Sequence, residues 1–171
     1  MRKNKPIVLA TVLFMSVGFA AVTTSLYFNG KLTIGTNNQD FNDNIVFSDA
    51  TTDGDSIAAI STDGKTIDVF TRNLKALGEE VTLDFVVENR SMQYDADATI
   101  KCDYANDDSR YNEYANITIS PSEFRVLSRE EVNGKLKIRL VKSFVGTDSD
   151  DFVQIEFKCR VDASAMERNG W

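Results

Sequence analysis

The sequence predicts an all-β chain, folded as an antiparallel two-sheet sandwich that follows an N-terminal hydrophobic signal or anchor helix. After residue 30, apolar and polar residues alternate in many short runs, as they do in half-buried strands. Polar turn signals separate these runs, and no long segment of the region has a helical period. A series of about eight to ten short strands is typical of a sandwich, jelly-roll or immunoglobulin-like, and a closed barrel is the alternative.

The first 25 residues have the pattern of a secretion signal. The basic head MRKNKP precedes an uncharged run, residues 7–28, which would reach about 33 Å as a helix and so match a hydrocarbon core of about 30 Å. Small residues follow the densest apolar part, and we expect a signal peptidase to cut in the region of Ala20, Ala21, Thr23 and Ser25. A retained membrane anchor is the alternative, and both forms export the rest of the chain.

Alternation predicts the strands in order along the exported part. Its four longest runs are 81–87 (VTLDFVV), 98–104 (ATIKCDY), 135–141 (KLKIRLV) and 152–161 (FVQIEFKCRV). Shorter strands are expected at 31–36, 44–50, 65–71, 115–120 and 123–128. Asp63-Gly64 and Asn133-Gly134 are dipeptides typical of hairpin turns. We place the sandwich domain at residues 26–162 and a short C-terminal tail at 163–171.

Composition excludes several functions. The chain of 171 residues carries a net charge of −7, which becomes −10 without Arg2, Lys3 and Lys5. Such an acidic surface argues against nucleic-acid binding, which needs cations against phosphates. The sequence has no histidine, the commonest general base and metal ligand. We therefore predict no enzyme activity, no catalytic residue, no cofactor and no metal site. We interpret the acidic loops at 49–56, 106–110 and 147–151 as solvated turns rather than calcium sites.

The two cysteines, Cys102 and Cys159, both occupy inward-facing positions of predicted strands. If these strands face each other, a disulfide can bridge them across the core, and export favours its oxidation. Two buried free thiols are the alternative. A catalytic thiol is not expected, because no histidine is present to activate it.

Two stretches resemble the TasA and camelysin family. Residues 73–102 share its Asn-Leu, Gly-acid and Glu-Asn pattern around two strands, and 26–36 (LYFNGKLTIGT) share its aromatic pair, Asn and Gly-Thr strand. The matching residues are Asn73, Leu74, Gly78, Glu79, Phe85, Glu88 and Asn89 in the first stretch, and Tyr27, Phe28, Asn29, Gly35 and Thr36 in the second. The chain departs from the family at Asn29-Gly30, where an Asp is usual, and at Lys75-Ala76-Leu77-Gly78, which lacks a Pro.

The resemblance implies a protein exported by a Gram-positive bacterium, cut by a dedicated signal peptidase and folded as a jelly-roll-like sandwich. Bacterial immunoglobulin-like domains share the strand pattern and are the alternative. The family includes biofilm-matrix fibre subunits and cell-surface proteins. Camelysin members have been described as metalloproteases, an activity that we do not carry over to a chain without histidine or an HExxH motif.

Two functional hypotheses follow. The first is a secreted or cell-surface structural protein that assembles with itself, or with other surface proteins, by β-strand addition. Its donor strand would be residues 26–36, with assembly residues Leu26, Phe28, Leu32 and Ile34. The second is a membrane-tethered monomeric module that binds a ligand and touches the membrane only through its N-terminal segment.

Overall fold

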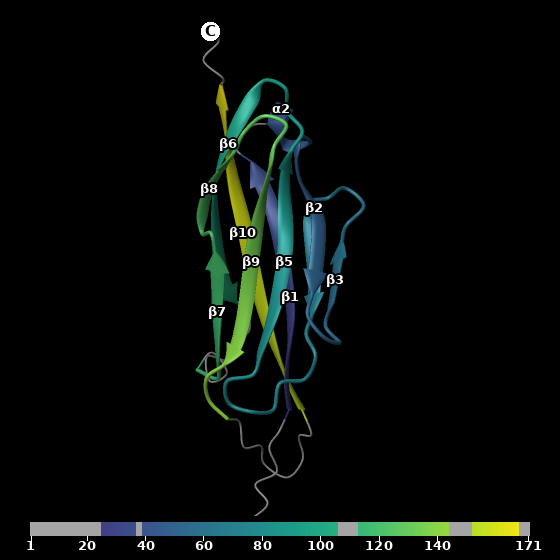
Figure 1. The fold of residues 1–171 in the computed structure, drawn as a ribbon, viewed down its shortest axis with the longest axis vertical. Coiled ribbons are helices and arrows are strands. Elements are labelled where there is room, and N and C mark those ends of the chain that lie inside the picture. Colours follow the sequence, from purple (N-terminus) through teal and green to yellow (C-terminus); the bar gives the residue numbers. More distant parts are fainter. Residues whose placement is uncertain (1–24, 37–38, 106–112, 144–151, 168–171) are drawn as a thin grey trace, which may run out of the picture.

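A computed structural model describes residues 25–36, 39–105, 113–143 and 152–167. In these residues, two sheets pack face to face in an elongated sandwich, which confirms the predicted all-β class (Figure 1). The predicted signal or anchor segment lies outside the described residues, apart from Ser25. Within the described ranges, no helix is long and apolar enough to cross a bilayer.

Within the described ranges, the larger sheet has six strands and the smaller has four. The larger sheet runs in the order β3 (Ile57–Ile60), β4 (Thr66–Phe70), β1 (Ser25–Thr36), β10 (Phe152–Glu167), β6 (Tyr94–Tyr104) and β8 (Glu123–Val126). The smaller runs in the order β2 (Ile45–Thr52), β5 (Glu80–Asn89), β9 (Glu131–Leu140) and β7 (Ala115–Ser120), and the short helix α2 (Gln39–Asn42) links β1 to β2. From β4 to β10 each successive strand lies in the opposite sheet, so strands that share a sheet are distant in sequence.

Alternation decides which side chains form the core. In β5, Val81, Leu83, Phe85 and Val87 are buried at every second position, as predicted. The Phe85 ring meets Phe47 of β2 edge-on, with ring centroids 5.9 Å apart. Each such side chain contributes about 1.5–3 kcal/mol by leaving water, so the shared inner faces of the sheets supply most of the stability.

The predicted hairpin turn at Asp63-Gly64 is confirmed between β3 and β4. Gly64 has a φ of 69°, in the left-handed region that favours glycine. The Asp63 carboxylate accepts hydrogen bonds from the Ser61 hydroxyl and the Lys65 amide, and these bonds lower the pKa of Asp63. The carboxylate therefore shapes this turn.

The predicted hairpin turn at Asn133-Gly134 is wrong, because both residues lie inside β9. Gly134 pairs with Phe85 of β5, and a Cβ atom at residue 134 would lie 2.3 Å from Cζ of the Phe85 ring. The glycine therefore makes room for an aromatic ring on the neighbouring strand instead of turning the chain.

Two further strand segments were not predicted, because they are rich in small residues and lack a clear alternation of large apolar and polar side chains. β3 (IAAI) was not predicted, since alanine has a low strand propensity. β10 continues to Glu167 and so corrects the predicted boundary at residue 162. Its inner face continues with Ala163 and Ala165, which pair with Ala98 and Ala96 of β6.

We predict that Gly134→Ala lowers the free energy of unfolding by about 1–3 kcal/mol, because the added methyl group must displace the buried Phe85 ring. This predicted loss is the opposite of the usual effect, because replacing a glycine inside a strand by alanine normally raises the free energy of unfolding. Urea denaturation measures the difference. Gly35→Ala is the matched control, since its Cβ would meet only the flexible end of Arg160, at 3.0 Å. Equal stability of Gly134→Ala and the wild type would contradict the packing described.

Candidate functional site

The four predicted assembly residues lie on one face of β1 and point into the core. Leu26, Phe28 and Leu32 are fully buried, and Ile34 is 7% exposed. The structure thus seats the predicted donor strand inside its own chain, between β4 and β10, instead of leaving it free beside an open edge. This arrangement makes the position of β1 the candidate functional site.

One wall of the site is β10. Each of the 12 residues of β1 has a partner on β10, from Ser25 opposite Phe152 to Thr36 opposite Ala163. The two strands run parallel, whereas all other paired strands among the described residues run antiparallel, as the sequence predicted. A parallel pair needs a long crossover connection, and here residues 37–151 lie between the two strands.

The other wall is β4 and the segment that follows it. β4 pairs with Asn29–Thr33 of β1. Beyond β4, the Thr71 hydroxyl accepts a hydrogen bond from the Phe28 amide at 2.8 Å, and the Thr71 amide donates to the Phe28 carbonyl at 2.9 Å. Leu26 and Leu74 exchange two backbone hydrogen bonds of 2.9 and 2.6 Å. Hydrogen bonds from this wall therefore pair the backbone groups of β1 as far as Leu26, close to the start of the strand.

Gly30 lies at the centre of the inner face of β1, directly opposite Phe157 of β10. The Phe157 ring is 1% exposed and occupies the volume that a side chain at residue 30 would need. This contact was missed by the sequence prediction. The signal was present, because a glycine inside an alternating run, L-x-F-x-G-x-L-x-I, often marks close approach of another group.

The outer face of β1 is polar. Lys31 forms an exposed ion pair with Asp68 of β4, with 3.4 Å between Nζ and Oδ1, and pairs in register with Lys158 of β10. Asn29 pairs with Glu156, and its Oδ1 is buried without a hydrogen-bond partner in the described part of the chain. An aspartate at residue 29 would face Glu156 with like charge, so this register disfavours the acid that is usual in the family pattern.

The connection after β1 is held by Lys65. Its ammonium group donates hydrogen bonds to the carbonyl oxygens of Asn42 and Ile45, on either side of the turn that ends α2. Burial lowers the pKa of Lys65, because desolvation disfavours the charged form. This side chain therefore fixes the segment through which β1 leaves the larger sheet.

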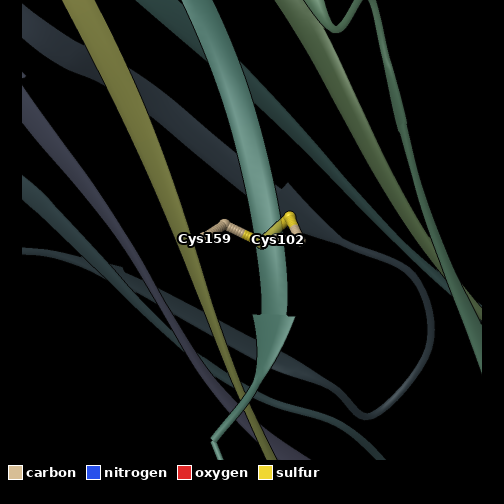
Figure 2. The surroundings of a disulfide bond; sticks show 2 residues. All are labelled: Cys102 and Cys159. Atoms are coloured by element: carbon tan, nitrogen blue, oxygen red, sulfur yellow. A yellow bond between two sulfur atoms is a disulfide. The ribbon is translucent and has the colours of Figure 1, made fainter.

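Cys102 and Cys159 form a disulfide, which confirms the predicted bond and excludes the free thiols (Figure 2). The predicted route across the core is wrong, because the two residues are direct partners on the adjacent strands β6 and β10 of one sheet. Their Cα atoms are 4.0 Å apart. The bond therefore fastens β10, one wall of the β1 site, to the rest of the larger sheet.

Two acidic side chains outside the β1 site link neighbouring segments of the fold. Asp97 of β6 accepts two hydrogen bonds from Arg125 of β8, at 2.6 and 3.0 Å, and this contact is the main cause of the lowered pKa of Asp97. Of the predicted acidic loop 49–56, residues 49–52 belong to β2, and Asp53, which follows the strand, accepts a hydrogen bond from the Thr82 amide. No group of three His, Cys, Asp or Glu side chains in the described ranges could hold a metal ion. The predicted acidic loops 106–110 and 147–151 lie outside those ranges.

Comparison with known proteins adds no assignment. No protein-family model matches the chain, and no curated protein matches it. The resemblance to the TasA and camelysin family therefore stays a prediction from the residues quoted above.

We predict that replacing both cysteines, in Cys102→Ala/Cys159→Ala, lowers the free energy of unfolding by about 4 kcal/mol, because the bond closes a long loop in the unfolded chain. Urea denaturation measures the change. Reductant should produce a similar loss in the wild type and no further loss in the double variant. Equal stability of the oxidised and reduced wild-type protein would contradict a structural role of the bond.

Proposed function

We propose that this protein is an exported structural or interaction protein of the cell surface or extracellular matrix, and that copies assemble by exchanging β1. One observation carries the proposal: β1, the first described strand, completes the core from the middle of a sheet, and within the described residues a single connection joins it to the remaining fold. Among the expected partners, copies of the same chain are favoured over other surface proteins, since the site already fits this strand.

The free energy gained by burying the apolar side chains of β1 is so large that an empty β1 site would be unstable. Burial of Leu26, Phe28, Leu32 and Ile34 contributes on the order of 6–12 kcal/mol in total, at about 1.5–3 kcal/mol for each side chain. This sum is similar to the whole stability of a typical domain, about 5–15 kcal/mol. A chain whose own β1 has left therefore needs another strand in the same place, and the β1 of a second copy restores every contact.

Exchange of this kind has a low cost in free energy at equilibrium, because the contacts within one chain and between two chains are the same. Rates are different, since the strand must leave a fully formed core before another can enter. We expect assembly to be fastest while the chain is still folding, for example after export, and slow from the closed monomer. If each copy passes β1 to the next without closing a ring, the product is a fibre.

Export is supported by two features. The disulfide between Cys102 and Cys159 suits an oxidising compartment, where such bonds persist. The basic head and apolar run of the N-terminus have the pattern of a secretion signal. Together with the family resemblance, they support a jelly-roll-like surface or biofilm-matrix protein of a Gram-positive bacterium, released by a signal peptidase.

The second candidate is a membrane-tethered monomeric module that binds a ligand. The observation that favours it is the closed chain itself, in which β1 already fills its own site. It requires an uncut N-terminal segment and no assembly. The intact mass of the protein from its native host separates the two candidates, because a mass that includes residues 1–25 supports the tether.

We predict that a disulfide between β1 and β4 of the same chain blocks assembly. Thr33 and Thr66 are direct partners on these strands, so Thr33→Cys/Thr66→Cys can lock β1 in place. The variant is made in the Cys102→Ala/Cys159→Ala background to prevent mispairing. After refolding and oxidation, electron microscopy and light scattering should detect monomers only, whereas the reduced protein should form fibres.

The matched control carries Lys101→Cys/Arg160→Cys in the same background, which ties β6 to β10 and leaves β1 free. It should assemble in both redox states. Fibres of the oxidised β1 lock, equal in amount to those of the reduced protein, would contradict exchange of β1. Wild-type protein that stays monomeric under every refolding condition would contradict assembly itself.

A further inference from the structure

We propose that the contact between Gly30 and Phe157 selects the strand that enters the β1 site, so that the site accepts this strand in one register and therefore takes a second copy of this chain as its partner. The inference rests on the proposed exchange of β1. It adds the residue pair that recognises the incoming strand and the register that this pair enforces.

The contact leaves no room for a side chain at the central position. A Cβ atom on Gly30 would lie 1.9, 2.1 and 2.3 Å from Cζ, Cε1 and Cε2 of Phe157, closer than carbon atoms approach without a bond. The ring is 1% exposed and belongs to the main core cluster, so its displacement would disturb the packing around it. An incoming strand therefore needs glycine opposite Phe157.

The same contact rejects shifted registers. A shift of two residues keeps the inner face of β1 but places Phe28 or Leu32 against the Phe157 ring. A shift of one residue turns the strand over and brings Asn29 or Lys31 to the inner face. Only the observed register combines a glycine opposite the ring with large apolar side chains at two positions on each side.

Among the strands that the structure describes, few have a glycine on the inner face. β9 also has an inward glycine, Gly134, but this residue already covers Phe85 in the smaller sheet, and β9 is internal to the chain. The two glycine–aromatic pairs therefore have separate roles. The contact of Gly134 with Phe85 sets the packing of β9 on β5, two strands that always belong to the same chain. The contact of Gly30 with Phe157 selects a strand that can come from another copy.

A complementary pair of variants tests the selection. Gly30→Leu gives a strand that clashes with a normal site, and Phe157→Ala gives a site that a normal strand leaves partly empty. In either variant alone, the β1 strand does not fit the site of its own chain or of an identical copy. In a mixture of the two variants, each strand fits the site of the other variant. The strand that carries the new leucine enters the site enlarged by the new alanine, and the unchanged Gly30 strand enters the site with the unchanged Phe157 ring.

Each full-length mature variant is refolded alone and in an equal mixture, with one variant labelled by a donor dye and the other by an acceptor. We expect the share of the protein that assembles to fall at least about tenfold for each variant alone, because the mismatch destabilises both the assembly and the closed monomer relative to the unfolded chain. The mixture should recover most of the wild-type yield, with energy transfer between the dyes. The milder pair Gly30→Ala and Phe157→Leu serves if a variant alone does not fold.

The outcomes separate this inference from the function on which it rests. Assembly of wild-type protein together with unchanged assembly of Gly30→Leu alone would overturn selection and leave exchange intact. Recovery in the mixture supports both. Wild-type protein that stays monomeric would overturn exchange, and with it the choice of partner. The double variant Gly30→Leu/Phe157→Ala is the control within one chain and should regain stability relative to either single variant in urea.

Discussion

The fold depends on the insertion of β1 between β4 and β10. Without this strand the larger sheet would separate into β3–β4 and β10–β6–β8, with two unpaired edges and an open core between them. The hydrogen bonds of Thr71 and Leu74 to β1 would be lost as well. β1, the first of the described strands, therefore joins the two parts of the larger sheet, and this sheet is complete only when β1 has met β10, the last of them.

The remaining parts of the structure keep the site in shape. The disulfide fastens β10 to β6, so one wall stays attached to its neighbour even when β1 is absent. β3 and β4 form a local hairpin around the Asp63-Gly64 turn, which supports the other wall. Lys65, in the same turn, binds the segment that follows β1. The fold thus combines two stable walls with a central strand that, among the described residues, is connected to them only after its last residue, Thr36.

The sequence predicted where most strands lie, but it did not predict which strands pair with each other. Alternation identified the inward residues of β5, β9 and β10, because it is a local consequence of a half-buried strand. It could not show that Cys102 and Cys159 belong to one sheet, or that β1 runs parallel to β10, since pairing depends on residues far apart in the chain. Gly134 was misread for a related reason: its role depends on Phe85, on another strand.

The parallel pairing of β1 and β10 also sets the direction in which the structure resists force. β1 begins at the same end of the sandwich as β10, and the C-terminal end of β10 lies at the opposite end (Figure 1). A pull on the start of β1 and the end of β10 therefore slides the strands along each other. Such shear loads the hydrogen bonds between them together, whereas peeling would break them one at a time. The geometry suits a molecule that bears tension along its length.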